Sequence, residues 1–435
     1  MAIASLALER REDGCALLAD GRVALVHTRE HPFLYLGKGE AHIEMHHGNF
    51  AIEDDIRELC PLTDWSVEAI SGIGFRFRFS SGNRRAVLVT ASLKDGRLWL
   101  HCAREEAGLA SDGTDRVRIV LPADGTEHVY GAGEQFSYLD LRGRKFPLWT
   151  SEQGVGRNRK SRITLEADLV DNAGGDYWWT FYPQPTFVSS AGYWVHMETS
   201  AYALFDFRKE HAHELYCWEL PESLVIGQAS SMPAVLEDLT AFFGRQGPLP
   251  EWCYQGVILG IQGGTHVCEQ KLARAREAGV PVAGIWAQDW EGINITSFGQ
   301  RLRWNWQWNR ERYPDLDKAI RRWRDDGVRF LAYANCYLGR DWPLCREAAA
   351  HGFLVKNLQG EDYYVDFGEF YAGIVDLTNP AAFDWFADTL KRELIDLGAS
   401  GWMADFGEYL PTDAVLFDGT PAIMAHNAWP ALWAR

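Results

Sequence analysis

The sequence predicts a multidomain protein in which an antiparallel β-sandwich, residues 1–235, precedes the first half of a (β/α)₈ TIM-type barrel, residues 236–435. The first observation is a series of short alternating segments before Met232, separated by Gly, Asp and Asn and almost free of helical periodicity. The second is a regular alternation of buried strand and helix after Met232, which is typical of parallel βαβ units. The third is that polar residues follow several of these later strands, where barrel enzymes place their active sites.

The first half of the chain consists of predicted strands. Alternation of apolar and polar residues is clearest over residues 74–80, 86–90 and 98–102, and residues 80–83 and 94–96 have the composition of hairpin turns. The further strands predicted here are residues 162–170, 187–188, 192–198 and 202–207. Regular strands of this kind favour a β-sandwich.

The second half alternates between strands and helices. The predicted strands are residues 255–261, 281–286, 328–333 and 400–404. The predicted helices are residues 234–243, 268–278, 316–326, 343–350 and 381–397, the last ending at Gly398. The continuous apolar run 255–261 is typical of a strand buried on both faces. Because these units supply about half of a barrel, the sequence indicates either a fragment of a longer protein, which we favour, or a fold that does not close.

The composition indicates a globular, acidic and aromatic-rich protein. Hydrophobic residues make up 47% of the chain and aromatic residues 13%, with 19 Trp, 16 Tyr and 22 Phe. Trp and Tyr combine an apolar face with a hydrogen-bonding edge, which suits carbohydrate, although large β-sandwich cores also use such residues. A net charge of −17 argues against nucleic acid as a partner, but local arginines can still hold a small anionic substrate.

The N-terminal segment and the cysteine pattern indicate the cellular compartment in which we expect the protein. The N-terminal apolar run is too short for a secretory signal, and no window is long enough to span a membrane. The eight cysteines are scattered without a CxxC pair, which favours reduced thiols over a disulfide framework or a zinc site. We therefore expect a cytoplasmic protein without membrane or nucleic-acid partners.

One acidic residue near the C-terminal end is the strongest catalytic candidate. The apolar run from Trp402 to Ala404 leads directly into Asp405, which is followed by Phe406 and Gly407. A carboxylate flanked by aromatic residues at the mouth of a barrel strand suits an enzyme that acts on a sugar, whose C–H faces lie on aromatic rings. The alternative is an ordinary strand-end aspartate that caps the next helix.

Glycoside hydrolysis requires two carboxyl groups, a nucleophile and a general acid. Glu408 and Asp289 are the possible partners of Asp405 within the chain. Because Glu408 follows Asp405 so closely, we expect it to support the site electrostatically instead of donating the proton. No phosphate loop, HExxH motif or dinucleotide fingerprint occurs, and His211 and His213 lie in a charged segment typical of exposed surface. Carboxylates are therefore the leading catalytic groups.

A second group of candidates lies in the long loop after the second barrel strand. Arg301 and Arg303 occur there with Trp304, Trp306 and Trp308. A guanidinium beside an indole N–H can bind an oxyanion from two directions. The alternative is a surface loop whose tryptophans pack on the barrel rim with arginine stacked on them.

Polar residues also follow the first two barrel strands. Gln262 follows the first strand, and Gln288 follows the second, which ends near Trp286. Because the carboxyl ends of barrel strands meet at one mouth, we expect these three residues to lie near the substrate.

Five motifs, taken in order, resemble glycoside hydrolase family 31, the retaining α-glycosidases. They are Gly133-Glu-Gln-Phe-Ser137, residues 146–157, Gln288-Asp-Trp290, Arg301 with Trp304, and residues 403–413. The resemblance covers essentially the whole chain and looks most like the branch that cleaves α-glycosides of 6-deoxy-6-sulfoglucose, the sulfoquinovosidases. The family has an N-terminal galactose-mutarotase-like β-sandwich and a (β/α)₈ barrel whose fourth strand carries an Asp nucleophile.

By this resemblance Asp405 is the nucleophile, Arg301 and the Trp304 indole N–H hold the sulfonate, and Gln288 contacts the O4 side of the sugar. A neutral amide at Gln288 avoids the repulsion that a carboxylate would exert on a sulfonate. The resemblance implies retaining hydrolysis of α-sulfoquinovosides such as sulfoquinovosyl glycerol, without a metal or organic cofactor. Activity of an α-glucosidase or α-xylosidase on neutral sugars is one alternative, and a non-catalytic glycan-binding role is another.

The resemblance also implies residues that this sequence does not contain. The family's acid/base Asp, a further Tyr on the sulfonate side and a sugar-binding His are expected beyond Arg435. We therefore expect residues 1–435 to be inactive by themselves.

Overall fold

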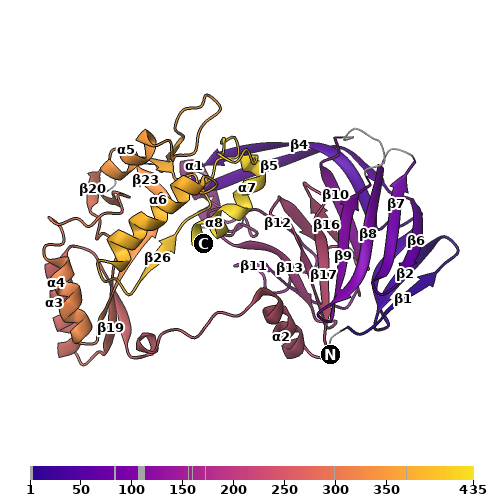
Figure 1. The fold of residues 1–435 in the computed structure, drawn as a ribbon, viewed down its shortest axis with the longest axis horizontal. Helices are drawn as coiled ribbons and strands as arrows, with labels where there is room; N and C mark the ends of the chain where they lie inside the picture. The colour runs from indigo at the N-terminus through magenta and orange to yellow at the C-terminus, as the bar shows by residue number, and fades with distance from the viewer. Residues whose placement is uncertain are drawn as a thin grey trace. The chain divides into compact units, whose positions relative to one another are not determined.

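The chain divides into two units, residues 1–245 and 246–435, each with its own sheets (Figure 1). The computed structural model describes residues 3–82, 85–105, 113–154, 156–158, 160–171, 173–297, 299–368 and 370–435. The observed division falls after the helix α2 (Met232–Phe243), whereas the expected one at residue 235 falls inside it. Val235 on α2 packs with Val188, Trp194 and Val225 in a hydrophobic cluster, which fastens the helix to the first unit.

The first unit is built from antiparallel strands in three sheets. A small sheet has the order β1 (Leu6–Arg10), β2 (Gly14–Ala19), β3 (Arg22–Thr28). A six-stranded sheet has the order β12 (Lys145–Leu148), β15 (Ala203–Asp206), β16 (Ala212–Cys217), β10 (Arg116–Pro122), β4 (Leu34–His46), β5 (Asn49–Pro61). An eight-stranded sheet has the order β11 (Val129–Gly133), β13 (Pro183–Ser189), β14 (Tyr193–Met197), β17 (Ser223–Gln228), β9 (Arg97–Arg104), β8 (Arg85–Lys94), β7 (Gly74–Ser81), β6 (Asp64–Ile70).

The two large sheets pack face to face, as a β-sandwich requires. Phe187 on β13 lies 6.0 Å from the ring of Phe205 on β15 and 5.1 Å from that of His213 on β16. These contacts join the eight-stranded sheet to the six-stranded one. The strand alternation predicted from the sequence places the buried side chains between the sheets, because successive residues of a strand face opposite sides.

The predicted hairpin at residues 94–96 is confirmed. Lys94 pairs with Arg97, and both Asp95 (φ 51°) and Gly96 (φ 71°) between them have left-handed backbone. Two positive φ angles are the signature of a type I′ turn, which matches the twist of the flanking strands. For the predicted turn at residues 80–83, β7 continues to Ser81, and position 83 lies outside the described residues.

The strand predicted over residues 162–170 is wrong, because this segment is the helix α1 (Arg162–Asp171). The Ser161 hydroxyl accepts a hydrogen bond from the backbone N–H of Thr164, and Arg162 pairs with Glu166 one turn further on. An N-cap and an i,i+4 ion pair are helix signals. The alternation that predicted a strand came from apolar residues that the helix leaves exposed, among them Leu169.

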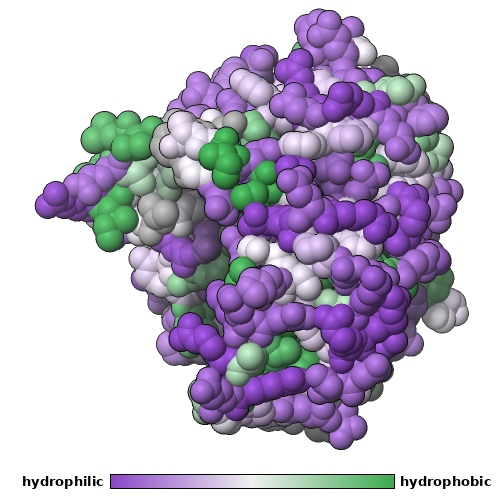
Figure 2. Space-filling model, turned by 90° about the vertical axis from the view of Figure 1, so that its left-hand side faces the viewer, coloured by the Kyte–Doolittle hydropathy of each residue, from purple (hydrophilic) through white to green (hydrophobic). Residues whose placement is uncertain are grey.

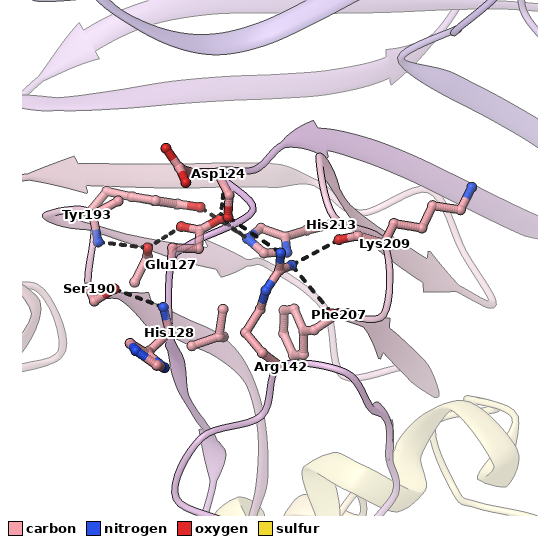
Figure 3. A network of polar contacts seen from close by, with 12 residues as sticks. Asp124, Glu127, His128, Arg142, Ser190, Tyr193, Phe207, Lys209 and His213 are labelled. Atoms are coloured by element: carbon pink, nitrogen blue, oxygen red, sulfur yellow. Dashed lines mark hydrogen bonds and ion pairs between the residues drawn. The ribbon is translucent and has the colours of Figure 1, made fainter.

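The prediction that both histidines of the charged segment are exposed is half wrong (Figure 3). His211 is exposed, but His213 on β16 is fully buried, and its Nε2 lies 2.9 Å from Glu127 and 3.1 Å from the Tyr193 hydroxyl. Ser189 also donates a hydrogen bond to Glu127. Strand alternation turns His213 into the core of the sandwich, where the network engages its Nε2, while its Nδ1 has no hydrogen-bond partner among the described residues.

The second unit contains one parallel sheet in the order β18 (Val257–Ile261), β19 (Val282–Ala287), β22 (Arg329–Asn335), β26 (Gly401–Asp405). The helices that accompany it are α3 (Thr265–Glu277), α4 (Leu316–Asp325), α5 (Pro343–Ala350) and α6 (Pro380–Leu390), which continues as the π-helical turn Lys391–Ile395.

The small antiparallel elements are β20 (Ile293–Thr296) with β21 (Gly299–Leu302), and β23 (Tyr337–Gly339), β25 (Tyr371–Ile374) and β24 (Tyr364–Asp366). The short C-terminal helices are η3 (His426–Ala428), α7 (Ala422–Ala425) and α8 (Trp429–Ala434), and η1 (Glu251–Tyr254) precedes β18. The four predicted strands and the alternating helices are therefore confirmed, while closure into an eight-stranded ring stays a prediction.

The outer strands of this sheet are more exposed than the sequence predicted. Val257 and Ile258 on β18 are 45% and 44% exposed, and Met403 on β26 is 44% exposed, although such apolar runs predict burial on both faces. Ile285 on β19 and Ala332 on β22 are fully buried. The difference has a simple cause, since β19 and β22 have a hydrogen-bonded neighbour on each side in the described sheet and the outer strands have one.

The surface reflects the acidic composition. On the face drawn in Figure 2, hydrophilic residues cover most of the surface and hydrophobic ones gather in separate patches. The chain as a whole has 60 acidic and 43 basic side chains, a net charge of −17. In the part of the chain that the structure describes, no helix is both long enough and apolar enough to cross a membrane.

Candidate active site

The parallel sheet brings three predicted strand-end residues, and one that was not predicted, into two contacts. Gln262, after β18, donates its amide N–H to the amide oxygen of Gln288, after β19, over 2.6 Å. Tyr333, near the end of β22, donates its hydroxyl to Asp405 Oδ2, at the end of β26, over 2.7 Å. Both contacts lie at the carboxyl ends of the strands, because the strands are parallel and in register. This edge of the sheet is the candidate active site.

Asp405 is held at the end of β26 by side chain and backbone together. Trp433 donates its indole N–H to the Asp405 carbonyl oxygen over 3.1 Å. Directly after it, Phe406 (φ 64°) and Gly407 (φ 130°) turn the chain sharply. A Cβ at Gly407 would lie 2.9 Å from Pro430 Cα, so only glycine fits this turn. Asp405 does not cap a helix, since the next described helix begins at Ala422.

Tyr333 is a site residue that we did not predict, and it determines how Asp405 is presented. Burial, together with the charge and hydrogen bond of Asp405, raises the pKa of Tyr333 far above its ordinary value, so the phenol stays protonated and donates. Asn335 reaches the Tyr333 hydroxyl over 3.4 Å. The sequence contained a signal for this residue. Tyr333 and Asn335 are two positions apart near the end of one strand, so their side chains lie on the same face of the sheet, and Asn335 pairs with Asp405 on the neighbouring strand.

Glu408 is buried, and its charge acts on Cys336 and Tyr337. Burial, and after it the charge of Glu408, raises the pKa of the Cys336 thiol to about 12. Its charge also contributes, after burial and Cys336, to the raised pKa of Tyr337. Glu408 is 4% exposed, and its expected supporting role stays a prediction.

Asp289, considered above as a catalytic partner, has a structural role instead. It is fully buried and accepts hydrogen bonds from the Gly263 backbone N–H over 2.9 Å and from the Tyr313 hydroxyl. Arg312 forms an ion pair with it at 2.5 Å. With its oxygens occupied, Asp289 ties the loop after β18 to the segment before α4.

Trp286 also has a structural function. Its indole N–H donates to the Ala332 carbonyl oxygen over 3.0 Å, which links β19 to β22. The ring edge of Trp286 lies 3.5 Å from the place where a Cβ on Gly260 would be, so it packs over β18. The predicted contact of Trp286 with substrate stays a prediction.

Trp304 forms the centre of an aromatic cluster beside Asp405. Its ring lies 4.6 Å from Phe367, 4.8 Å from Phe370, 5.3 Å from Phe406 and 5.7 Å from Tyr337. Phe406 directly follows Asp405, so this cluster joins the Trp304 loop to the carboxylate. Trp304 has a left-handed backbone (φ 51°), which is rare for an aromatic residue and concentrates at functional sites.

The other side chains of the Arg/Trp loop follow the alternative of packing on the rim. Trp306 donates its indole N–H to the Tyr337 carbonyl oxygen over 3.0 Å, and Trp308 donates to that of Tyr313 over 2.8 Å. The Arg303 guanidinium lies 4.2 Å from the centre of the Trp342 ring. Arg301, on the exposed hairpin strand β21, is different, because no ion pair or ring contact engages it among the residues that the structure describes.

Glu291 is a second residue that the sequence did not single out. Its side chain is buried, and it accepts hydrogen bonds from the backbone N–H groups of Arg303, Trp304 and Asn305 over 3.1 to 3.4 Å. Burial raises the pKa of Glu291 to about 8, although these backbone N–H groups and the charge of Arg303 act in the opposite direction. No local sequence pattern predicts such hydrogen bonds between a side chain and three backbone N–H groups 12 to 14 residues away.

The described residues contain no group of three or more His, Cys, Asp and Glu side chains arranged to hold a metal ion. The eight cysteines all lie within them and are free thiols. The candidate site contains a held carboxylate, an amide pair and an aromatic cluster, and Arg301 is exposed on the hairpin that leads to Trp304. This combination suits recognition of a sugar.

Comparison with known proteins decides the family. Residues 6–161 match the glycosyl hydrolase 31 N-terminal galactose mutarotase-like domain, and residues 255–435 match the glycosyl hydrolases family 31 TIM-barrel domain. The chain belongs to glycoside hydrolase family 31. Each of these family 31 domains falls within one of the two structural units, on the side that the sequence predicted.

Among the similar family 31 proteins are sulfoquinovosidases. The chain is 51% identical over 427 residues to a sulfoquinovosidase of Escherichia coli (strain K12), and 43% identical over 435 residues to one of Agrobacterium fabrum. Each comparison covers 98% of this chain and 62% of the relative. A solved family 31 sulfoquinovosidase from E. rectale, in complex with the aza-sugar inhibitor IFGSQ, superposes with a TM-score of 0.91 at 41% identity, over 98% of this chain and 63% of that one.

Proposed function

We propose that this family 31 chain belongs to a retaining α-glycoside hydrolase that cleaves α-sulfoquinovosides, such as sulfoquinovosyl glycerol, and releases sulfoquinovose. The observation that carries the proposal is the strand-end carboxylate Asp405, held by Tyr333 beside the cluster of Trp304. The similarity to two sulfoquinovosidases over nearly the whole chain supports the substrate class.

In the proposed reaction Asp405 is the nucleophile. The Tyr333 hydroxyl occupies Oδ2, which leaves Oδ1 to attack the anomeric carbon while the bond to the leaving oxygen breaks. An acid protonates that oxygen, and the resulting glycosyl ester is hydrolysed by water that gives its proton to the same residue. In a retaining enzyme the two carboxyl groups lie about 5–5.5 Å apart. Asp289 is paired with Arg312 and Glu408 is buried, so the proposal assigns the acid/base role to neither of them.

The sulfonate would be bound by Arg301 and the Trp304 indole. Arg301 is exposed and without an ion-pair partner among the described residues, so its donors are available to an oxyanion. Gln262 donates to the amide oxygen of Gln288, and this contact leaves the Gln288 NH₂ group as a donor to the sugar. Neutral amides at this position recognise the sugar without repelling its sulfonate.

The test is hydrolysis by the gene product that contains these 435 residues. We expect it to release p-nitrophenol from p-nitrophenyl α-sulfoquinovoside, and to act on p-nitrophenyl α-glucoside at least about 100-fold more weakly in kcat/KM. Preference for the glucoside would overturn the proposal in favour of an α-glucosidase or α-xylosidase. Residues 1–435 alone are expected to bind sulfoquinovose without turning over either substrate, and calorimetry measures that binding. Failure of both proteins to bind or hydrolyse a sulfoquinovoside would also reject the proposal.

A further inference from the structure

Glu291 lies at the base of the hairpin that carries Arg301. The chain leaves Glu291, forms the antiparallel pair β20 and β21, and returns to Glu291 at Arg303. There Oε1 accepts the backbone N–H groups of Arg303 over 3.1 Å and Trp304 over 3.4 Å, and Oε2 accepts that of Asn305 over 3.4 Å. One side chain therefore holds both ends of the hairpin together.

The same three contacts hold an unusual backbone in place. Trp304 has a left-handed φ of 51°, and its own N–H is one of the donors to Glu291. On the other side, the Trp304 carbonyl oxygen accepts the backbone N–H of Gly339 over 2.9 Å. A strained conformation persists only where its surroundings hold it firmly. Glu291 supplies part of that support, next to the residue that places the indole in the aromatic cluster.

Burial also affects the charge state of Glu291. Burial raises its pKa to about 8, so it is mostly neutral at pH 7. The charged groups around it are already engaged, since Arg303 donates Nε to the Ile293 carbonyl oxygen and stacks on Trp342, and Asp289 is paired with Arg312. A neutral carboxyl group can accept backbone N–H groups without placing a negative charge at the base of the hairpin that carries Arg301.

We propose that Glu291 is a positioning residue for sulfonate recognition, which fixes the hairpin that presents Arg301 and the backbone that presents Trp304. The inference rests on the proposed function, because it assigns these two residues to the sulfonate. Glu291 itself touches no substrate, and it acts through the loop.

Three variants test this inference in the active gene product. Glu291→Ala removes both acceptor oxygens, Glu291→Gln keeps one of them in a neutral side chain of the same shape, and Glu311→Ala changes an exposed glutamate of the same connection as a control. We expect Glu291→Ala to raise KM for the α-sulfoquinovoside about 10-fold or more, with kcat and the KM for a neutral α-glucoside changed by less than about threefold. Glu311→Ala should stay close to wild type, and Glu291→Gln, which keeps the acceptor shared by Arg303 and Trp304, should lose less than Glu291→Ala. Equal losses on both substrates, or no loss with Glu291→Ala, would overturn the inference.

The pH dependence gives a second measurement. Above pH 8 the wild-type carboxyl group ionises, so KM for the sulfonated substrate should rise there, whereas Glu291→Gln should not show this rise. An identical alkaline rise in both proteins would count against the inference. Comparison of the circular dichroism spectra of the variants shows whether each has folded.

Amide hydrogen exchange at Arg303, Trp304 and Asn305 separates the inference from the proposed function. Whatever the substrate, exchange at these three amides should be faster in Glu291→Ala. In Glu291→Gln the single amide oxygen should keep the protection of Arg303 and Trp304, while Asn305, whose acceptor is replaced by an NH₂ donor, should exchange faster. A wild-type protein without activity on sulfoquinovosides would reject the proposed function and with it the sulfonate role of Glu291. Unchanged exchange in Glu291→Ala in an active enzyme would reject only the positioning role.

Discussion

The amide of Gln262 donates to the amide oxygen of Gln288 over 2.6 Å, across the ends of two neighbouring parallel strands. The contact orients Gln288, because its oxygen is occupied and its NH₂ group is the part left to face a ligand. A pair of neutral amides is therefore aligned at the strand ends, at a position where a carboxylate would act differently on a charged sugar.

Replacing this amide with a carboxylate should change specificity. In Gln288→Glu, the new negative charge should repel a sulfonate, so KM for the α-sulfoquinovoside should rise about 10-fold or more while that for a neutral α-glucoside changes little. Steady-state kinetics on both substrates measures the ratio. Gln288→Asn, which keeps the amide but shortens it, controls for loss of the Gln262 contact. An equal loss on both substrates in Gln288→Glu would contradict the electrostatic explanation.

Loss of the nucleophile should abolish turnover without loss of binding. Asp405→Asn keeps the shape of the side chain and an oxygen for the Tyr333 hydroxyl, so kcat should fall about 1,000-fold or more with sulfoquinovose affinity within about threefold. Calorimetry measures the affinity, and p-nitrophenol release measures the rate. Retained turnover would remove Asp405 from the mechanism.

The Tyr333 hydroxyl should matter for the rate. Tyr333→Phe removes the 2.7 Å hydrogen bond to the Asp405 carboxylate, and we expect kcat/KM to fall about 10- to 100-fold because a hydrogen bond to a charged group is lost. Tyr254 is an exposed tyrosine, and Tyr254→Phe is the matched control. If both variants behave like wild type, the hydroxyl does not position the carboxylate.

Arg301 should discriminate between sulfonated and neutral substrates. Arg301→Ala should raise KM for the α-sulfoquinovoside about 10- to 100-fold and leave that for the neutral α-glucoside within about threefold, since the guanidinium binds only the anion. Arg301→Lys should recover part of the loss, because an ammonium retains the charge without the bidentate geometry. The same KM ratio in wild type and Arg301→Ala would exclude Arg301 from sulfonate binding.

The buried pair of Glu127 and His213 in the β-sandwich should make the free energy of unfolding depend on pH. Burial alone would raise the pKa of Glu127, but hydrogen bonds from His213 and Ser189 outweigh it and lower the pKa below its ordinary value. A lowered folded-state pKa stabilises the fold above the unfolded-state pKa, near 4.3, and this contribution is lost as pH falls through the folded-state pKa. Glu127→Gln should therefore cost about 1–3 kcal/mol at pH 7, and the difference from wild type should shrink below about pH 4.

Urea denaturation followed by tryptophan fluorescence, repeated from pH 7 to pH 3, measures this difference. Glu210→Gln, which changes an exposed glutamate in the turn before β16, is the control. A difference that stays constant over the whole range would show that the charge of Glu127 does not stabilise the sandwich.

The order and type of the elements could be predicted from the sequence, because they depend on local periodicity. The turn at Asp95 and Gly96 and the strand that ends in Asp405 both appear where the pattern placed them. The incorrect prediction arose where a local pattern was compatible with both a strand and a helix. Residues 162–170 alternate like a strand, yet the capping hydroxyl of Ser161 and an ion pair favour helix.

The sequence by itself determined which residue types stand at the strand ends, among them Asp405, Gln288 and Gln262, because strand ends can be read from apolar runs. Only the tertiary structure decided their partners. The hydrogen bond from Gln262 to Gln288 spans 26 residues, and the one from Tyr333 to Asp405 spans 72. Such contacts depend on which strands are neighbours and in which register they pair, and no local pattern contains that information. For the same physical reason the role of Glu291 could be recognised only in the folded chain, since its three partners directly follow the second strand of the hairpin, 12 to 14 residues along the chain.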